Sequence, residues 1–227
     1  MNTERAKSAW DQVAQLEGWD ESTGVELGVH TSYNYRINPK HLCFVLSRYK
    51  FCAKLLARRN RVLEIGCGDA FGTPIVAQTV NHMLAIDWDP RLIAGNEQRL
   101  SFVKNCTFAH HDIVTGPLTE TFDGIYSVDV IEHIDPGVED QFMRNCCGML
   151  VENGLFVAGT PNIRADAYAS PSSRVGHINL KDALALEQLL LRYFDTVFLF
   201  SMNDEIVHTG YYDMAHYLFG VGIGVRR

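Results

Sequence analysis

The stretch "RVLEIGCGDAFGTP", residues 61–74, decides the fold of this chain. A mostly apolar run that carries Glu64 leads directly into Gly66, Gly68 and Gly72. Such a run is typical of a strand buried in a parallel sheet, and the glycines allow a tight turn against which a ligand can lie. The spacing GxGxxxG differs from the GxGxxG of dinucleotide-binding turns. A carboxylate at position 64 would also repel a pyrophosphate and suits a cationic or hydroxyl-rich ligand.

The chain after residue 60 alternates short apolar runs with helix-like stretches. Strands are predicted at 61–66, 82–87, 105–109, 122–128, 153–159 and 195–201, and helices at 74–80, 90–100, 137–151 and 182–193. A last apolar run, 215–225, is predicted to return antiparallel at the edge of the sheet. This order predicts an α/β fold with a doubly wound, mostly parallel seven-stranded sheet, whose ligand sites lie at the carboxyl ends of the strands.

The first 58 residues are predicted to form a helical cap segment, followed by a cofactor-binding domain over residues 59–227. Helices are expected at 3–17 and at 39–57, the second with Asn38 as its N-cap. Arg36 lies just before this helix, in the aromatic stretch "HTSYNYRINPKH". Its guanidinium is a candidate to bind the carboxylate of a cofactor or an anionic acceptor, the alternative being an ordinary surface arginine.

Composition narrows the classes of protein. The 227 residues carry a formal net charge of −7, so a broad nucleic-acid footprint is not expected. No apolar run is long enough for a membrane span and the start lacks a secretory pattern, so we expect a cytoplasmic protein. The six cysteines show no zinc-ligand spacing and are interpreted as core residues.

Acidic residues follow two further predicted strands. Asp87 lies 21 residues after Gly66, the interval at which a carboxylate can accept both ribose hydroxyls of an adenosine. Asp112 follows the third strand and is a candidate to accept from an adenine amino group. The alternative for both residues is a capping or turn role. Together with Glu64 they predict an adenosine site without a phosphate-binding device.

The ordered series VLEIGCGDAFGT, LAIDWDP, FAHHDI, FDGIYSVDVIEHIDP and ENGLFVAGTPN resembles the motifs of class I S-adenosylmethionine-dependent methyltransferases over about residues 60–160. The resemblance implies a Rossmann-like methyltransferase fold with S-adenosylmethionine as cofactor. It also implies these cofactor contacts: Glu64 with the Gly66, Cys67 and Gly68 backbone for the methionine part, Asp87 for the ribose, Trp88 beside the adenine, and Asp112 with Ile113 at the adenine edge. Ala70 departs from the family, whose members usually have a third glycine there.

The segment "SVDVIEHIDP" carries the candidates for catalysis, Asp129, Glu132 and His133. It resembles the O-methyltransferases of ubiquinone biosynthesis, in which the acidic pair and the histidine can hold a divalent cation such as Mg²⁺ or Mn²⁺ near the acceptor oxygen. Without a metal, His133 is the natural general base, and a purely structural role is the third alternative. Asp129 is also a candidate cofactor contact. His177, in the long polar segment after the fifth strand, is a second candidate base.

The predicted function is methyl transfer from S-adenosylmethionine to a small-molecule acceptor. The polar segment 162–179 favours a hydroxyl oxygen of a sugar or phosphorylated metabolite, as in polysaccharide or natural-product biosynthesis. A quinone or phenol acceptor is the first alternative, and a noncatalytic binding protein with a cofactor fold is the second. A nicotinamide-dependent dehydrogenase is disfavoured by Glu64 and the glycine spacing. The tail after residue 201 is interpreted as packing at the edge of the sheet, with a hydrophobic lip for the substrate and a dimer contact as the alternatives, so a homodimer stays open.

Overall fold

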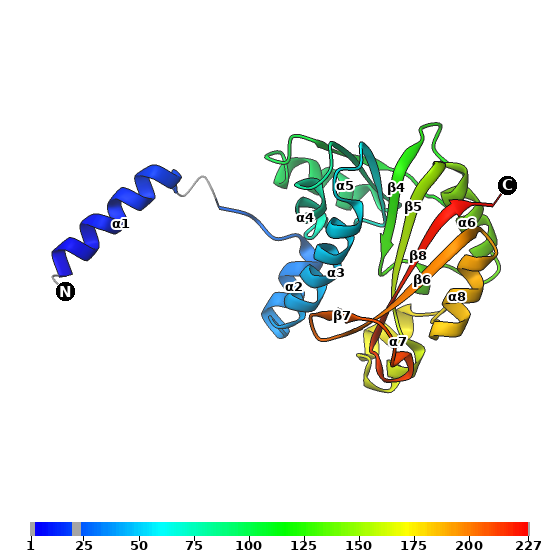
Figure 1. Cartoon of the computed structure of the whole chain (residues 1–227). Coiled ribbons are helices and arrows are strands. Elements are labelled where there is room, and N and C mark those ends of the chain that lie inside the picture. Colours follow the sequence, from blue (N-terminus) through cyan, green and yellow to red (C-terminus); the bar gives the residue numbers. More distant parts are fainter. Residues whose placement is uncertain (1–2, 20–23, 227) are drawn as a thin grey trace.

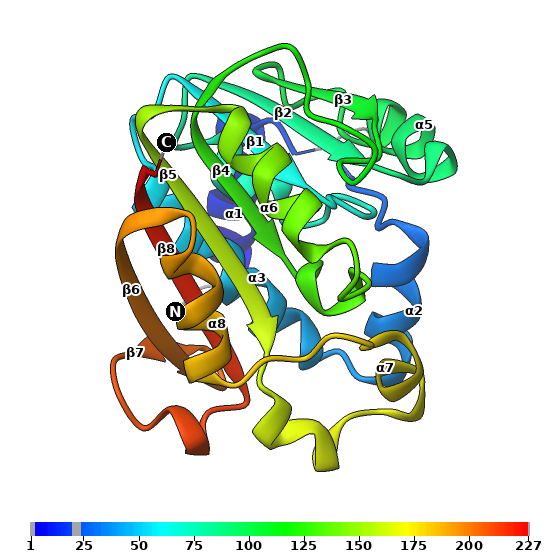
Figure 2. The ribbon, with the colours of Figure 1, turned by 90° about the vertical axis from the view of Figure 1, so that its right-hand side faces the viewer.

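The computed structural model describes residues 3–19 and 24–226 and contains one eight-stranded sheet with helices on both faces (Figures 1 and 2). Its strands have the order β3-β2-β1-β4-β5-β8-β6-β7. Their bounds are β1 Arg61–Ile65, β2 His82–Asp87, β3 Cys106–His110, β4 Phe122–Val128, β5 Leu150–Pro161, β6 Phe194–Asn203, β7 Ile206–His208 and β8 Tyr217–Val225. The first five strands run parallel to one another. The α/β, mostly parallel fold predicted from the sequence is therefore confirmed.

Two apolar cores cover the two faces of the central strands. On one face α6 (Glu139–Gly148) and α8 (Ala183–Leu191) pack against side chains such as Leu63 and Ile125. On the other face α3 (His41–Leu56) and α4 (Thr73–Ala77) pack against side chains such as Val62 and Tyr126. A further helix, α5 (Pro90–Arg99), packs on β2 and β3. Because neighbouring residues of β1 point into opposite cores, its nearly continuous apolar run follows from burial on both sides.

The last long strand lies inside the sheet and not at its edge. β8 is antiparallel to both of its neighbours, β5 and β6, so the expected direction is right and the expected edge position is wrong. Residues 217–222 of β8 are all buried. At an edge, such a strand would expose its apolar side chains and a row of unpaired backbone N–H and C=O groups. In the interior of the sheet, both of its backbone edges are paired and its side chains are covered. The short β7, which pairs with β6 and was not predicted, raises the strand count from seven to eight.

The N-terminal part contains α1 (Thr3–Glu17), α2 (Val29–Ile37) and α3, and α1 lies apart from the sheet in Figure 1. Helix α2 was not predicted. The expected N-cap role of Asn38 is wrong, because Asn38 ends α2, where its N–H donates to Asn34 O, and α3 begins at His41. The long segment after β5 contains the short helices η3 (Ile163–Tyr168) and α7 (Pro171–Gly176). Among the described residues, none of the helices is both long and apolar enough to cross a membrane.

Candidate functional site

The glycine turn follows β1 directly and is tied to the neighbouring strand. Gly66 has φ +73° and Gly68 has φ +55°, in the left-handed region that favours glycine. A Cβ added at Gly66 would lie 2.3 Å from Cγ2 of Val130, the second residue after β4, so this close approach also requires glycine here. The N–H groups of Gly66 and Cys67 both donate to Ile86 O, at 2.9 and 3.0 Å. The turn is therefore held at the carboxyl ends of β1 and β2.

Glu64 is buried beneath this turn. One carboxylate oxygen accepts a hydrogen bond of 2.7 Å from Thr73 Oγ1 at the start of α4, and the other is buried without a partner among the described residues. Burial raises the pKa of Glu64 to about 7, against the lowering effect of the Thr73 hydroxyl. Burial therefore favours the uncharged form of this carboxyl group.

Asp87, at the end of β2, organises the turn from the other side. Its Oδ2 accepts from Gly68 N at 2.8 Å and its Oδ1 accepts from Asp89 N at 2.9 Å. Asp89 in turn caps α5 by accepting from Arg91 N, as the sequence Asp-Pro indicates. The neighbouring Trp88 is 68% exposed, which leaves its ring accessible to a ligand. The residues predicted for a ribose and for the face of an adenine therefore stand side by side next to the glycines.

The predicted adenine-edge residues lie after β3 and differ in exposure. Asp112 is exposed, and its Oδ1 accepts from Val114 N at 2.9 Å, which is the turn role considered as its alternative. Ile113 is buried in the core, and its backbone O accepts from Asn145 Nδ2 at 2.6 Å. The contact of Asp112 and Ile113 with an adenine stays a prediction.

Helix α2 docks on the glycine turn, a contact that the sequence analysis missed. Thr31 N and Thr31 Oγ1 donate to the two carboxylate oxygens of Asp69, each at 2.8 Å, in a buried position. At the start of the helix Gly28 lies so close that an added Cβ would meet Asp69 Cβ at 2.2 Å. Arg36, the predicted cofactor contact, lies in the last turn of the same helix and is exposed. The segment that carries Arg36 is therefore fixed directly to the turn.

Removing the Thr31 hydroxyl is expected to loosen this contact. Thr31→Val keeps the backbone hydrogen bond to Asp69 and removes the one donated by Oγ1. A hydrogen bond to a charged group contributes about 1.5–3 kcal/mol. We expect S-adenosylhomocysteine to dissociate about 10-fold faster or more, measured by stopped-flow fluorescence. Thr196→Val, on the exposed side of β6, is the control. An unchanged dissociation rate in a folded Thr31→Val protein would show that α2 does not retain the ligand.

An ion pair between Arg48 and Asp129 lies directly after the end of β4. Asp129 has φ +57°, an uncommon conformation for a residue other than glycine, and its Oδ2 lies 2.6 Å from Arg48 Nη1 of α3. The Arg48 guanidinium carbon is 3.9 Å from the centre of the Tyr217 ring. Arg48 was missed in the sequence, although a single arginine on the apolar face of a helix is a signal that a buried partner exists. The pair brings α3, β4 and β8 together at one point.

Glu132 is fully buried next to this pair. Its Oε2 accepts a hydrogen bond of 3.0 Å from Thr160 Oγ1 at the end of β5. Burial, and to a smaller extent the charge of Asp129, raise the pKa of Glu132 to about 8. Burial therefore favours the uncharged form of Glu132, and its second oxygen, Oε1, is buried without a hydrogen-bond partner among the described residues.

His133 is positioned by the long segment after β5. Its Nδ1 lies 2.8 Å from Gly176 O, and its ring centre is 5.1 Å from that of His177. Because a carbonyl oxygen only accepts, Nδ1 must carry the proton in this bond, which leaves Nε2 of the neutral ring as an acceptor. The neighbouring Asn179 N donates to Glu132 O at 3.0 Å and holds the same loop. Both predicted bases are thus brought together.

The expected metal ligands are only partly assembled. Ligand atoms of Glu132, His133 and His177 lie within 4.8 Å of one another, whereas Asp129 is bound to Arg48. Two imidazoles and a carboxylate are reasonable ligands for a divalent cation, provided that Glu132 loses its proton. Metal binding stays a prediction, and the geometry favours His177 over Asp129 as its third ligand.

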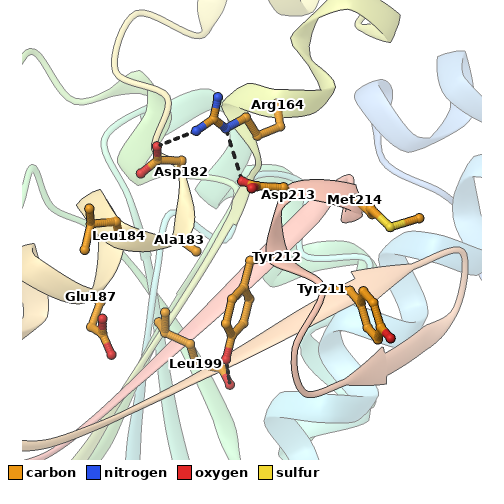
Figure 3. A pocket seen from close by; sticks show the side chains of 10 residues that line it. All are labelled: Arg164, Asp182, Ala183, Leu184, Glu187, Leu199, Tyr211, Tyr212, Asp213 and Met214. Carbon is orange, nitrogen blue, oxygen red and sulfur yellow. Dashed lines mark hydrogen bonds and ion pairs between the residues drawn. The ribbon is translucent and has the colours of Figure 1, made fainter.

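A separate pocket of about 630 Å³ opens between η3, α8 and η4 (Tyr212–Met214) (Figure 3). Arg164 bridges Asp182 and Asp213 there, at 3.5 and 3.3 Å. None of the residues predicted for cofactor or catalysis lines it. Asn162, beside this pocket, is buried and donates to Tyr212 O and Ala215 O, so it fixes the loop that carries Tyr212. The pocket is therefore distinct from the site at the glycine turn.

Comparisons with known proteins identify methyltransferases that are similar to this chain. Residues 62–154 match the family described as "Methyltransferase domain". A probable S-adenosylmethionine-dependent methyltransferase of Mycolicibacterium smegmatis is 30% identical over 115 residues, which are 50% of this chain and 42% of that protein. A ubiquinone biosynthesis O-methyltransferase of Parvibaculum lavamentivorans is 31% identical over 149 residues, 60% of this chain and 56% of that protein. The matched parts therefore cover about half of these curated relatives.

The solved structure of the N-methyltransferase NodS from Bradyrhizobium japonicum WM9, in complex with S-adenosylhomocysteine, has the same fold. The TM-score is 0.61 at 22% identity, with 85% of this chain and 91% of that chain covered. The sheet and the turn at its carboxyl edge define a Rossmann-like protein of the methyltransferase type. Residues 62–154 are thus similar to the methyltransferase domains of S-adenosylmethionine-dependent enzymes.

Proposed function

We propose that this protein transfers the methyl group of S-adenosylmethionine to a hydroxyl oxygen of a small polar acceptor, with His133 as general base. The single observation that carries the proposal is the hydrogen bond from His133 Nδ1 to Gly176 O. It orients the ring and leaves Nε2 unprotonated at the carboxyl end of β4, beside the glycine turn. An oxygen acceptor needs such a base, because its proton must leave as the new bond forms.

The cofactor site fits an adenosine-containing cation. Glu64 has a buried carboxylate oxygen without a partner, and Asp87 lies at the end of the next strand. The first suits the methionine part of the cofactor, whose ammonium and sulfonium are positive, and the second suits the ribose hydroxyls. When bound, S-adenosylmethionine supplies a methyl group that the sulfonium already activates.

The residues of the chain then have three tasks. His133 Nε2 accepts the proton of the acceptor hydroxyl while that oxygen bonds to the methyl carbon and the carbon–sulfur bond breaks, leaving neutral S-adenosylhomocysteine. Burial favours the uncharged form of Glu132, and Arg48 pairs with Asp129, so these three residues leave His133 as the proton acceptor. His177, at ring contact with His133, provides a route for the proton to leave.

The class of acceptor, a metal ion, the cellular location and the oligomeric state are further parts of this proposal. The polar segment 162–179, which includes Gly176 and His177, supports a sugar or phosphorylated metabolite over a quinone with a lipid tail. A Mg²⁺ or Mn²⁺ ion held by Glu132, His133 and His177 would replace the base by lowering the pKa of the acceptor hydroxyl. A cytoplasmic location and a homodimer also stay predictions.

Cofactor affinity is expected to fall below about pH 7. Burial favours the protonated form of Glu64, whereas the ammonium group of S-adenosylhomocysteine favours the ionised carboxylate, so we expect binding to release that proton. We expect the Kd of S-adenosylhomocysteine to rise as pH falls, by up to about tenfold per pH unit. Calorimetry at pH 5.5–8.5, in buffers of different ionisation enthalpy, measures the Kd and the proton released.

Glu64→Gln is the control for this titration, because it keeps the shape and cannot ionise. Its affinity is expected to be weak and nearly independent of pH over the same range. The stability of the ligand-free protein provides an independent check. A carboxyl group whose pKa is raised on folding stabilises the folded state less as pH rises from about 4.5 to about 7, and Glu64→Gln removes that loss. Identical pH profiles for the two proteins would contradict the assignment of Glu64.

The proposed function is tested in two stages. The first titrates the protein with S-adenosylhomocysteine and with NAD, and we expect only the former to bind, at micromolar Kd. The second follows formation of S-adenosylhomocysteine from S-adenosylmethionine with sugars, sugar phosphates and catechols, with and without Mg²⁺. Binding without turnover on any hydroxyl, but with turnover on amines, would reject oxygen as the target. Absence of cofactor binding by the folded protein would favour a noncatalytic protein.

A further inference from the structure

We propose that a buried polar network holds the general base in its reactive form. The network consists of the side chains of Glu139, Asn179 and Lys181. It acts on His133 through the carbonyl group of Gly176, so its members are positioning residues. The proposal rests on the proposed function, because it takes His133 as the group that accepts the proton of the methyl acceptor.

The segment that carries Gly176 has no apolar anchor of its own. It leaves the end of β5 and returns to the start of α8 at the same end of the sheet (Figure 2). None of residues 163–180 is buried, whereas Asn162 and Lys181 on either side are buried and pair in a short parallel bridge. Because apolar burial does not fix this segment, its polar contacts determine where the backbone lies.

Lys181 has an acceptor for each of its three N–H groups. Its Nζ lies 2.5 Å from Glu139 Oε2, and it donates to Asn179 Oδ1 at 2.6 Å and to Asn179 O at 3.3 Å. The side-chain amide of Asn179 donates to the same oxygen of Glu139 at 2.7 Å. The side chains of Lys181 and Glu139 are only 9% and 14% exposed. A buried network with every donor of its lysine used holds one arrangement of its members.

Two contacts connect this network to the base. Asn179 N donates at 3.0 Å to the backbone oxygen of Glu132, the residue before His133. Gly176 O accepts from His133 Nδ1 at 2.8 Å and from Ile178 N at 3.1 Å. The turn between Gly176 and Asn179 is therefore attached at both of its ends to the segment that carries the base. A displacement of Asn179 would move the carbonyl oxygen that selects the Nδ1–H form of His133.

Stability alone does not explain why these charges are buried. Taking an ammonium and a carboxylate out of water costs free energy that their attraction only partly returns, so a buried ion pair is weak evidence for stability. The pair does fix the relative position of the elements that carry it, here the segment before α8 and Glu139 at the start of α6. Arg192 Nη2, 3.6 Å from Glu139 Oε1, places a second cation at this carboxylate.

The carboxyl groups of Asp129 and Glu132 lie outside the network. One oxygen of each accepts a hydrogen bond, from Arg48 and from Thr160, and the other is buried without a partner among the described residues. In the described part of the chain, the hydrogen bond between the network and Glu132 uses only the backbone oxygen of Glu132. The positioning of His133 therefore does not depend on the protonation of either carboxyl group.

The first readout is the tautomer of His133, which needs no acceptor. In protein that contains ¹⁵N-labelled histidine, long-range ¹H–¹⁵N spectra show which ring nitrogen carries the proton. The signals of His133 are identified by their absence in His133→Gln. In mildly alkaline buffer, which keeps imidazoles neutral, we expect the Nδ1–H form in the wild type. In Asn179→Ala we expect a mixture with the Nε2–H form, because the amide that holds the turn is gone.

The second readout is turnover with an acceptor that the wild type methylates. We expect kcat of Asn179→Ala to fall about 10–100-fold, since a misplacement of about 1 Å can cost about 10²-fold. The Kd of S-adenosylhomocysteine should stay within about twofold of wild type, because distant sites respond independently. Lys181→Met is a second variant with the same expected results. Its melting temperature is measured, because Glu139 loses its nearest cation.

Asn105→Ala is the matched control. Asn105 is half-buried, as Asn179 is, but it lies at the amino end of β3. Its side-chain amide donates to Ala77 O at 2.8 Å and to Val80 O at 3.0 Å. The control variant therefore also loses two side-chain hydrogen bonds. We expect it to lower the melting temperature and to retain the tautomer of His133 and kcat.

Several results would overturn the positioning role. They are an Nε2–H form of His133 in the wild type, and an unchanged tautomer or an unchanged kcat in folded Asn179→Ala. An equal loss of kcat in Asn105→Ala would also overturn it, as would a matching loss of S-adenosylhomocysteine affinity in Asn179→Ala, since both indicate a general loosening of the fold. Full activity of His133→Ala would instead reject the proposed function, and the tautomer would still show whether the network fixes the ring.

Discussion

His133→Ala is expected to lower kcat by about 10²–10⁴-fold and to leave the affinity for S-adenosylhomocysteine within about twofold of wild type, because a positioned general base contributes a factor of that size. The ring contacts the backbone of Gly176 and the ring of His177, and among the described residues no hydrogen bond joins it to the glycine turn. The substitution therefore removes the proton acceptor without disturbing the cofactor site. Turnover is measured as S-adenosylhomocysteine formed at saturating cofactor and acceptor.

Two further variants separate a base from a structural residue. His133→Gln retains an amide that can donate to Gly176 O, so it should preserve the loop and still lose turnover. His82→Gln, at the opposite end of the sheet, should retain full activity. A loss of activity at every pH is expected for His133→Ala, whereas a residual activity that rises with pH would show that hydroxide replaces the base. Full activity of both His133 variants would leave His133 a structural role only.

The sequence predicted the part of the site whose signals are local. Residues 61–68 combine a strand pattern with a glycine turn, so β1, Glu64 and the turn were placed from one stretch. Asp87 was placed in the same way, because it ends a second apolar run at a fixed interval from the glycines. A parallel sheet brings the carboxyl ends of such strands to one edge, and so the relative position of these residues follows from the strand assignment alone.

Contacts between distant residues were not predictable in this way. Thr31 and Asp69 are 38 residues apart, and Thr31 lies in a polar stretch that shows no helical period. Helix α2 forms because its first turn is capped by a carboxylate from the glycine turn, which is a tertiary effect. Arg48 and Asp129 are 81 residues apart, and only the fold shows that a charge on the apolar face of α3 meets a partner. The acceptor side of the site depends on such contacts and was therefore predicted less completely.

The position of β8 illustrates the same limit within the sheet. The apolar run at residues 217–225 predicts a strand. Because β8 follows β6 along the chain, pairing between β6 and β8 is expected. The sequence does not state that β8 also pairs with β5. Glycines decide this packing: an added Cβ at Gly220 would lie 2.3 Å from Leu190 Cδ1 of α8. Helix α8 can thus approach β8 only because the strand lacks a side chain there.

Asp87→Ala is expected to weaken S-adenosylhomocysteine binding by about 10²–10⁴-fold. If the carboxylate accepts two ribose hydroxyls, each bond contributes about 1.5–3 kcal/mol, and both are lost together. The same carboxylate accepts from Gly68 N and Asp89 N in the ligand-free protein, so the variant also loosens the turn itself. Calorimetric titration measures the Kd, and the melting temperature in the absence of ligand measures the second effect.

Asp123→Ala is the matched control for this prediction. Asp123 also accepts from two backbone N–H groups, those of Asn60 and Arg61, but it does so at the amino end of the sheet. Both variants therefore lose two backbone hydrogen bonds to a carboxylate, and only Asp87→Ala should lose the ligand. A similar loss of affinity in both proteins would mean that general destabilisation, and not contact with the ribose, explains the result. Tight binding by Asp87→Ala would contradict the ribose assignment and would move the adenosine site away from the end of β2.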